Sequence, residues 1–510
     1  MPNKLFYGDN LDNLRKFRDE IVDLCYIDPP FNSKRNYNHI YNNIRNGEDR
    51  AQAQAFIDTW EWDDQAIEGF QEIIGNDKGR YTAQTVALIK GLHDVLKEGS
   101  LLAYLVSMTR RIVEIYRVLK DTGSFYLHCD PTSSHYLKLI LDAVFCAQGG
   151  EFQNELIWNY SGWNAQLAGA FNWRHDVILF YAKRPKQHFN SYRLNWGSEE
   201  EYLRLRKQKL QVDKDGRKYV LSDAGKGQRV KRYLEEAMAY GQPVDDVWPI
   251  DKINNSSKEK LEYPTQKPEA LMERIIKASS NEGDLILDAY AGCGTTVAVA
   301  QQLNRRWIGM DITYQAISVI LKRLETAFGR DVATAVILDG APKDMESARA
   351  LAHKKDDRLR KEFEKWAVLT YSMNRARPND KKGADAGIDG FATFMTSRTE
   401  NASIVFQVKS GHVGRGDIAK LNSDRRREGA ALATLITLEP STAPMRAEAK
   451  AVGKYTYELT GRQWDIIQIV TVQEIIEERK RLELPLIADI LKKSPQRADA
   501  AEQLELLEVG

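Results

Sequence analysis

The sequence predicts an α/β protein of more than one domain. Its 510 residues exceed the usual size of a single hydrophobic core, and its hydrophobic share of 43% supports globular folding. Between Leu5 and Phe125, short apolar strands alternate with longer amphipathic helices. This alternation is the pattern of a parallel sheet covered by helices.

The bulk composition excludes several classes of protein. The net charge of +1 favours no particular partner, so a nucleic-acid surface must be sought in local clusters. The four cysteines have no CxxC pair or metal-ligand spacing, which predicts neither disulfides nor zinc. The N-terminus lacks a signal pattern, and no apolar run reaches the roughly 18 residues of a membrane helix. We therefore expect a soluble, cytoplasmic protein.

The first strong element is an apolar strand at Ile21–Ile27. It stops at Asp28-Pro29-Pro30, where two prolines exclude both helix and central strand. Chemistry is expected there, because ligands of parallel sheets bind at the carboxyl ends of strands. Further strands are predicted from Leu101–Val106 or just after it, Gly123–Cys129 and Val177–Ala182.

A basic, aromatic segment follows, from Lys183 to about Trp248. Arginines and lysines crowd together in it, and tyrosines and tryptophans are interleaved. Basic groups neutralise phosphates and aromatic faces stack on bases, so we predict an insertion that contacts nucleic acid. The alternative is a solvated helical insertion, in which the acidic run at 199–201 partly balances the charge.

The next unit is a strand, a glycine turn, a helix and a second strand. These elements are predicted at Asp284–Asp288, Ala291–Thr296, Val297–Leu303 and Arg306–Asp311. Such a turn brings backbone amides against a ligand, and the acid that ends the next strand commonly accepts ribose hydroxyls. The unit predicts a nucleoside-type pocket, although a GxG turn alone also serves as a tight helix entry. The GxGxxG spacing of nicotinamide-binding proteins is absent.

The Asp28-Pro29-Pro30-Phe31 segment is the more specific signal. The exocyclic amino nitrogen of adenine is a poor nucleophile because its lone pair is delocalised into the ring. The Asp28 carboxylate and the Pro29 carbonyl can each accept one of its N–H groups, and the rigid prolines fix the carbonyl direction. Phe31 can stack on a base flipped out of the duplex. The alternative is a strand terminated by prolines and an N-cap-like Asp.

Taken in order, these motifs resemble the amino-group DNA methyltransferases of the permuted β class over roughly residues 1–330. The segment from Phe6 to Asn38 is most similar to modification subunits of type III restriction systems. The resemblance implies a Rossmann-like fold, S-adenosyl-L-methionine as cofactor and a target-recognition insertion at 183–262. It also implies catalytic roles for Asp28 to Phe31 and cofactor-binding roles for Asp9, Asn10, Thr265, Lys267, Asp288, Tyr290, Gly292, Gly294, Thr295 and Asp311.

Two details refine this resemblance. The family usually has Phe or Pro where this chain has Ala289 and Tyr290, but Tyr290 keeps an aromatic ring, so we expect cofactor binding. Asp rather than Ser at position 28 favours adenine N6 over cytosine N4 as the target.

The C-terminal part resembles the PD-(D/E)xK restriction-endonuclease fold of the Mrr type. Asp389 precedes a strand at Ser403–Gln407 that leads into Lys409, and Glu364 lies on a preceding helix. The resemblance implies that Asp389 and the backbone near Val408 hold Mg²⁺, that Lys409 orients water, and that Glu364 assists with the metal. Gln407 stands where many relatives have Glu, which lowers the local negative charge. A solvent-facing turn, or a degenerate nuclease that only grips DNA, are the alternatives.

The predicted organisation is a methyltransferase domain at 1–330, a linker at 331–358, an endonuclease-like domain at 359–478 and a charged helical tail at 479–510. The leading hypothesis is a double-stranded-DNA adenine-N6 methyltransferase of a restriction–modification or phage-defence system. A restriction subunit or a second copy of the chain is the candidate further partner. A single-chain restriction enzyme, a cytosine-N4 methyltransferase and a non-catalytic DNA-binding protein are the alternatives.

Overall fold

The computed structural model describes residues 2–30, 60–162, 169, 171–191, 193–223, 225, 227–254, 256–261, 263, 265–353, 357–379, 387–396, 401–457 and 461–484. A nine-stranded mixed sheet of order β11-β4-β5-β3-β2-β12-β13-β1-β14 forms its centre. Strands β3, β2, β12, β13, β1 and β14 run parallel, and β5 is antiparallel to β3. In chain order the strands are β1 (Lys4–Tyr7), β2 (Val22–Ile27), β3 (Leu119–Cys129), β4 (Glu151–Asn159), β5 (His175–Ala182), β11 (Val247–Pro249), β12 (Leu285–Asp288), β13 (Arg306–Asp311) and β14 (Ile337–Asp339).

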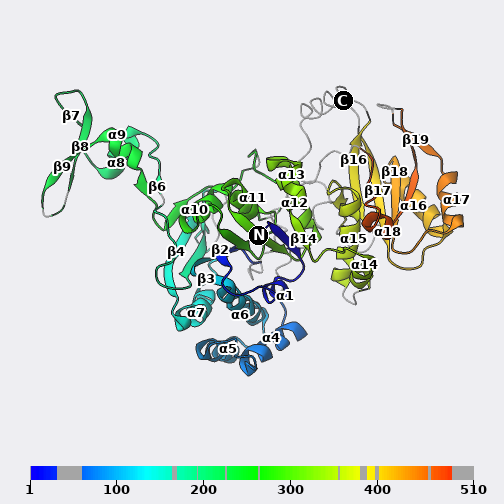
Figure 1. Ribbon diagram of the computed structural model, residues 1–510, viewed down its shortest axis with the longest axis horizontal. Coiled ribbons are helices and arrows are strands. Elements are labelled where there is room, and N and C mark those ends of the chain that lie inside the picture. The colour runs from blue at the N-terminus through cyan, green and yellow to red at the C-terminus, as the bar shows by residue number, and fades with distance from the viewer. Residues whose placement is uncertain are drawn as a thin grey trace.

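Helices cover both faces of this sheet, because its central strands are apolar on both sides (Figure 1). In β2, Leu24 and Tyr26 face one core, and Cys25 and Ile27 face the other. The second core is covered by α1 (Asn10–Leu14), α4 (Asp64–Gly75), α5 (Ala83–Leu96), α6 (Ser100–Val118) and α7 (Ser134–Val144), which η1 (Cys146–Gln148) follows. The first core is covered by α10 (Glu269–Ser279), α11 (Thr295–Gln302) and α12 (Tyr314–Phe328).

The α/β class is confirmed, and so are most of the predicted elements. β13 has the predicted bounds, and β2, β3, β5, β12 and α11 overlap their predicted positions. The strand predicted at Leu101–Val106 is wrong, because this segment is part of α6. The five residues from Leu102 to Val106 are all buried, since α6 lies between the sheet and other helices. A continuous apolar run of this kind carries no periodicity that separates helix from strand.

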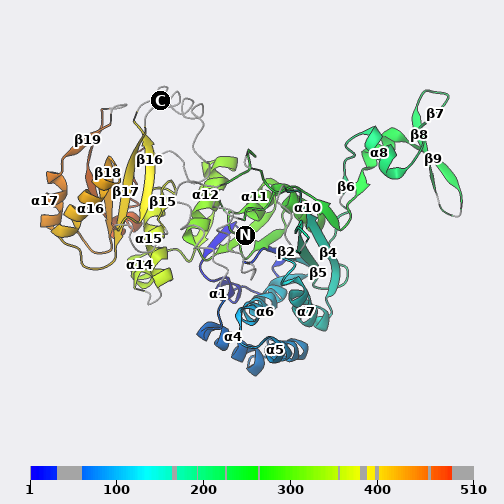
Figure 2. The same cartoon turned by 180° about the vertical axis from the view of Figure 1, so that it is seen from behind.

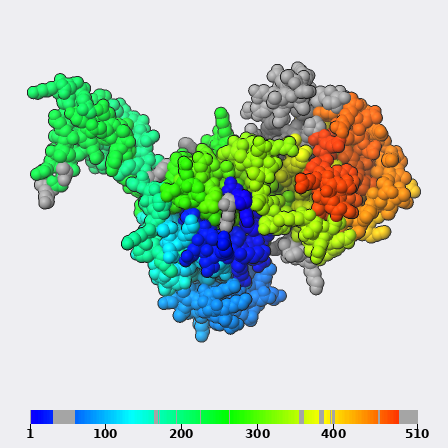
Figure 3. Space-filling view, viewed as in Figure 1, coloured from blue at the N-terminus to red at the C-terminus, as the bar shows by residue number. Residues whose placement is uncertain are grey.

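The segment 183–262 leaves the body of the molecule and returns to it (Figures 1 and 3). Its three-stranded sheet β7-β8-β9 packs on two short helices around Tyr202, Val220 and Leu234. The elements are β6 (Arg193–Leu194), α8 (Glu199–Arg206), β7 (Gln211–Val212), β8 (Lys218–Asp223), β9 (Arg229–Tyr233), α9 (Leu234–Tyr240) and β10 (Gln242–Pro243).

The C-terminal domain has its own five-stranded sheet, of order β15-β16-β17-β18-β21. It lies on the opposite side of the central sheet from the insertion in both views (Figures 1 and 2). Its elements are α15 (Asp357–Tyr371), β15 (Arg377–Pro378), β16 (Gly390–Met395), β17 (Asn401–Lys409), α16 (Arg415–Arg427), β18 (Leu432–Thr437), α17 (Ala443–Ala451), β19 (Lys454–Thr456), β20 (Gln463–Asp465), β21 (Ile467–Thr471) and α18 (Val472–Ile476). Most of the predicted tail, 485–510, lies outside the described residues.

The segment predicted as a linker, 331–358, contains regular structure. Strand β14 pairs with β1 at the edge of the central sheet, and α14 (Met345–Ala352) packs on α15. One hydrophobic cluster includes Ile317 and Leu324 of α12 together with Phe363 and Trp366 of α15. The two domains therefore share a core rather than being joined by an exposed tether.

Candidate functional site

Three carboxylates meet at the carboxyl ends of adjacent parallel strands. Asp28 follows β2, Asp288 ends β12 and Asp311 ends β13, and β12 lies between the other two strands in the sheet. The fold therefore brings the proline motif and the glycine-turn unit together, although most of the chain separates them. This edge is where parallel sheets bind ligands.

Asp28 forms an ion pair with Lys267. The Nζ of Lys267 contacts Oδ2 of Asp28, and both side chains are mostly buried. Pro29 is buried and Pro30 is exposed, so the chain leaves the sheet at this point. Phe31 lies outside the described residues. The structure thus places Lys267, predicted as a cofactor residue, directly against the predicted catalytic carboxylate.

The glycine loop between β12 and α11 has a backbone that only glycine adopts easily. Gly292 and Gly294 have φ of +50° and +75°. A Cβ on Gly294 would lie 2.7 Å from Cγ1 of Ile320 in α12. The Gly292 N–H donates to Oδ2 of Asp311 at 3.0 Å. Asp311, which ends β13, therefore holds the glycine loop in place at the carboxyl edge of the sheet.

Burial raises the pKa of the two acids beside this loop. The pKa of Asp288 rises to about 7 although its carboxylate accepts hydrogen bonds from Thr296 and the Tyr290 N–H. The pKa of Asp311 rises to about 6 despite donors from Thr313 and the loop. Hydroxyl donors or a positive charge at this edge would favour the ionised forms of both acids.

Helix α1 is tied to the same loop by Asp9, Asn10 and Arg111. Nδ2 of Asn10 donates to the carbonyl of Ala289 at 2.7 Å. Arg111, on α6, donates from Nε to Oδ1 of Asn10 at 2.6 Å and from Nη2 to both oxygens of Asp9 at 3.1 and 3.0 Å. Asp9 also caps α1 by accepting the Leu11 N–H. This network fixes α1 and α6 against the glycine loop.

Three other predicted cofactor residues lie in or near the glycine loop and Lys267. Thr295 is buried, and its hydroxyl donates to the carbonyl of Lys267 at 3.3 Å. The ring of Tyr290 packs inward, with its hydroxyl 3.6 Å from the sulfur of Met108. Thr265 is exposed, and its carbonyl accepts from Nζ of Lys267 at 3.4 Å.

A buried polar chain supports the sheet beneath Asp28. The hydroxyl of Tyr26 lies 2.9 Å from Nδ1 of His128, and Nε2 of His128 lies 3.3 Å from Oδ2 of Asp176. Because a carboxylate only accepts, Nε2 carries the proton of this contact. Burial alone would raise the pKa of Asp176, but the bond and charge of His128 and nearby lysines lower it to about 2.

The C-terminal domain gathers Asp389 and Gln407 at its sheet. Oδ2 of Asp389 accepts the N–H of Val408 at 2.7 Å. Gln407 is 1% exposed; its Nε2 donates to the carbonyl of Gly387 at 2.6 Å, and its Oε1 has no hydrogen-bond partner among the described residues. A buried acceptor without a donor is costly. This oxygen is therefore a candidate contact for a bound ligand.

Glu364 and Lys409 complete the predicted set. Burial raises the pKa of Asp389 to about 7, and the charge of Glu364 adds to that rise. Burial also raises the pKa of Glu364, against the nearby charges of Lys361 and Lys409. Within the described ranges, no group of three or more His, Cys, Asp or Glu side chains is placed to hold a metal ion. Among the described residues, the predicted set offers a cation the carboxylates of Glu364 and Asp389 and the amide oxygen of Gln407.

The insertion presents aromatic rings paired with cations. Arg217 lies over the ring of Tyr233 at 3.5 Å, and Lys231 lies over the ring of Tyr219 at 4.5 Å. The two tyrosines are opposite each other on β8 and β9, so they share one face of the small sheet. Such a face combines positive charge with stacking surface.

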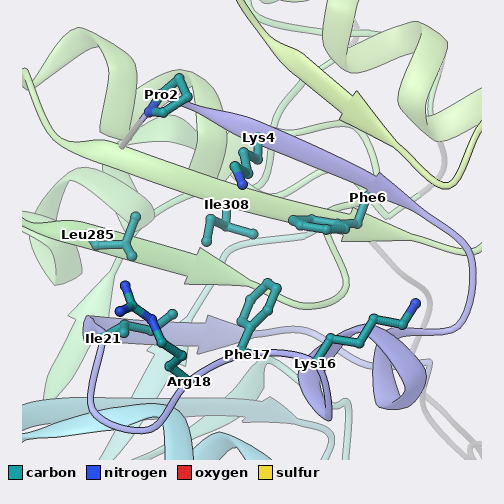
Figure 4. A pocket seen from close by; sticks show the side chains of 9 residues that line it. All are labelled: Pro2, Lys4, Phe6, Lys16, Phe17, Arg18, Ile21, Leu285 and Ile308. Atoms are coloured by element: carbon teal, nitrogen blue, oxygen red, sulfur yellow. The ribbon is translucent and has the colours of Figure 1, made fainter.

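A separate cavity of about 170 Å³ lies away from this site (Figure 4). It is lined by Lys4, Phe6, Phe17, Arg18 and Leu285, among others. Lys4 and Leu285 begin their strands, so the cavity is at the amino end of the sheet and not at the edge that carries the acids.

None of the helices that the structure describes is long and apolar enough to cross a membrane.

Two residues of the site were missed by sequence reasoning. Arg111 lies on α6 beside other charged residues such as Arg110 and Glu114, so no local signal separates it from them, although its own side chain is mostly buried. Glu362 lies on α15 in the C-terminal domain, and its carboxylate accepts the N–H of Tyr314 at 2.8 Å, three residues after Asp311. No local pattern distinguishes Glu362 from the charged residues around it.

Comparison with known proteins agrees with this arrangement. The DNA methylase family matches residues 22–322, and the restriction endonuclease family of the Mrr type matches residues 359–477. The type II methyltransferase M.HpaI of Haemophilus parainfluenzae is 32% identical over 216 residues, which are 42% of this chain and 57% of that protein. The chain thus spans less than two thirds of that relative.

Two further relatives extend the match. The DNA adenine methyltransferase YhdJ of Escherichia coli (strain K12) is 26% identical over 63% of this chain and 83% of its own length. The Mod subunit of the type III restriction-modification enzyme StyLTI of Salmonella typhimurium is 24% identical over 59% of this chain and 50% of its own length. The family match covers more than half of the chain and includes all three strand-end acids. The chain belongs to the DNA methylase family of N6 and N4 amino-methyltransferases, and it carries a C-terminal Mrr-like restriction endonuclease domain.

Proposed function

We propose that this protein transfers a methyl group from S-adenosyl-L-methionine to the N6 amino nitrogen of adenine in double-stranded DNA, as the modification activity of a restriction–modification system. The observation that carries the proposal is the position of Asp28-Pro29-Pro30 at the carboxyl end of β2, next to the glycine loop and the acids of β12 and β13. The candidate acceptor for the amino group and the residues predicted to bind the cofactor's nucleoside part are thus neighbours.

Asp28 and Pro29 supply the acceptors that the reaction needs. The carboxylate of Asp28 and the carbonyl of Pro29 each accept one N–H of the amino group and direct the nitrogen lone pair towards the methyl carbon. Asp28 can accept from the amino group while Lys267 stays bound, because a carboxylate has about four lone-pair positions. Phe31 would stack on the flipped base, and the aromatic and basic face of the insertion would contact the DNA.

The residues at this edge of the sheet are chemically suited to S-adenosyl-L-methionine. This group supplies a methyl on a positively charged sulfonium, which makes the methyl carbon electrophilic. Asp311 would accept ribose hydroxyls, and the buried carboxylate of Asp288 favours a cationic ligand because burial opposes its unpaired charge. The positive φ of Gly292 and Gly294 lets the backbone approach a ligand closely.

Adenine is favoured over cytosine by the residue at position 28. Asp28 is the acidic variant of the motif, and one relative with a long match, YhdJ, is named as an adenine methyltransferase. Cytosine N4 is the competing target because its amino group has the same two N–H donors.

The decisive experiment is to incubate the protein with labelled S-adenosyl-L-methionine and unmodified DNA, digest the DNA to nucleosides and identify the methylated base. We expect N6-methyladenine, and we expect the Asp28→Ala variant to lose it while retaining cofactor binding. N4-methylcytosine would correct the base, and the absence of transfer to any DNA would contradict the proposal.

A second activity, Mg²⁺-dependent DNA cleavage, is favoured by Oε1 of Gln407, which is buried near Asp389 and has no hydrogen-bond partner in the part of the chain that the structure describes. Asp389 and Gln407 would hold the cation, which would stabilise negative charge on the phosphate, and Lys409 would orient the attacking water. The test is cleavage of unmodified DNA with and without Mg²⁺. We expect Asp389→Ala to lose cleavage and keep methylation; wild-type protein that leaves DNA intact with Mg²⁺ would indicate a domain that only grips DNA.

A further inference from the structure

Helix α15 contributes to both domains through opposite faces. Glu362, Trp366 and Thr370 are spaced by four residues and lie on one face. Glu362 accepts the N–H of Tyr314, and the Thr370 hydroxyl donates to the Tyr314 hydroxyl at 3.2 Å. On the other face, Tyr371 packs against Phe406 of the endonuclease sheet. The helix is therefore a structural element of the methylase domain as well.

Glu362 lies next to the acid that ends β13. It is 8% exposed. Its carboxylate receives the first N–H of α12, and it is hydrogen-bonded to the hydroxyl of Tyr7 at the end of β1. Tyr7 is the register partner of Asp311, and its ring packs edge-on against Tyr314 at 5.5 Å. Glu362 thus holds Tyr7, which lies beside Asp311 on the neighbouring strand, and Tyr314, which follows Asp311 by three residues.

Helix capping alone does not account for a carboxylate in this place. Thr313 already caps α12, because its hydroxyl accepts the Ala316 N–H. Burying a carboxylate is costly unless it is paired, and Lys365 pairs with Glu362 at 3.0 Å. A neutral side chain could accept the Tyr314 N–H without needing a paired cation. The charge of Glu362 therefore requires an explanation in terms of its neighbours.

We propose that Glu362, supplied by the endonuclease-like domain, is a positioning residue of the methylase cofactor site. It fixes the start of α12 and the Tyr7 hydroxyl, and in this way it sets the orientation and charge environment of Asp311. The methylase site is then incomplete without α15. This inference rests on the proposed binding of S-adenosyl-L-methionine.

The titratable groups around Asp311 make the pH dependence of cofactor binding a readout of Glu362. The Asp311 carboxylate is faced by Asp288 from β12, Tyr263 from the loop before α10, Tyr7 from β1 and Glu362 from α15. Burial is the main cause of its raised pKa, and the carboxylate of Glu362 adds to it. An acceptor of ribose hydroxyls works best when ionised, so cofactor affinity should fall as pH decreases through about 6.

The experiment measures equilibrium binding of S-adenosyl-L-methionine to the full chain between pH 5 and 8. Glu362→Gln keeps the shape and the acceptor oxygen but removes the charge, so the loss of affinity should move to lower pH. Glu362→Ala also removes the acceptor for Tyr314 and Tyr7, and its Kd at pH 7.5 should rise by about tenfold, which is the loss expected for a buried hydrogen bond to a charged group.

Glu477→Gln is the matched control. It makes the same change of charge at an exposed position of the same domain, and its binding curve should equal that of wild type. A thermal melt shows whether each variant is folded, and Glu362→Gln tests the inference even if Glu362→Ala does not fold. Wild-type affinity and an unshifted pH profile in Glu362→Gln would overturn the inference. Wild-type protein that fails to bind would instead overturn the proposed function on which it rests.

Discussion

Asp288 offers a direct test of how the site is built, through the substitution Asp288→Asn. The side chain is 4% exposed at the end of β12, and burial raises its pKa to about 7 from an ordinary value of 3.8. When folding raises the pKa of an acid, protonation of that acid stabilises the folded state. The contribution of Asp288 to the free energy of unfolding is complete below pH 3.8 and is lost as the pH rises through about 7.

The size of the effect follows from that shift. About three pKa units correspond to about 4 kcal/mol, since one unit is about 1.4 kcal/mol. Asparagine is neutral at every pH and keeps an acceptor oxygen for the Tyr290 N–H. Without cofactor at pH 8, the Asn variant should therefore be more stable than wild type by up to about 4 kcal/mol. At pH 4 the difference should vanish.

The assay is thermal unfolding at several pH values, followed by the transition of the methylase domain. A domain of this size gains about 2 °C in Tm per kcal/mol, so the variant should melt up to about 8 °C higher at pH 8. A Tm below that of wild type at pH 8 would refute the reasoning. It would mean that the donors of Thr296 and the loop overcome the cost of burying the charge.

Three further substitutions test other parts of the structure. Gly294→Ala should destabilise the methylase domain by about 1–3 kcal/mol, because its φ is +75° and the new Cβ would lie 2.7 Å from Ile320; Gly91→Ala in α5, where the space is open, should be neutral or stabilising in the same melt. Asp176→Asn should lower stability by about 2 kcal/mol at pH 7, because the folded pKa of about 2 provides stability that is lost only as pH falls below 3.8. Urea unfolding at pH 7 and pH 3 checks this, and an equal loss at both values would contradict it. Arg111→Met should weaken cofactor binding severalfold, because Asp9 and Asn10 lose their shared partner; binding equal to that of wild type in titration calorimetry would show that α1 orders the loop alone.

The motifs at the strand ends could be predicted from the sequence because their signals are local. The strand at Arg306–Asp311 is bounded by a glycine-containing unit before it and a helix cap after it, and β13 has the same bounds. Asp28 could be placed at a strand end because prolines terminate β2 directly. In an α/β fold, residues at the carboxyl ends of parallel strands converge, so local signals were sufficient to bring these acids together.

Elements without a local signal could not be predicted in the same way. The run from Leu102 to Val106 is buried throughout, so it lacks the alternation that identifies a half-buried strand and the stripe that identifies a surface helix. The composition at 331–358 resembles a linker, yet β14 pairs with β1 because an open sheet edge gains hydrogen bonds from an added strand. Both outcomes depend on neighbours that are distant in the sequence.

The supporting residues of the site show the same dependence most clearly. Arg111 and Asn10 meet across 101 positions of the chain, and Glu362 meets Tyr314 across 48. Arg111, Asn10 and Glu362 are common polar residues on helices, where a solvent-exposed position is the usual expectation. Their roles arise only when the helix packs against the edge of the sheet that carries the acids. Short sequence motifs therefore supply the chemical groups of this site, whereas its geometry depends on α6 and on a helix of the neighbouring domain. For this reason a substitution at Glu362, outside the methylase motifs, is a more stringent test of the assembled site than a substitution within them.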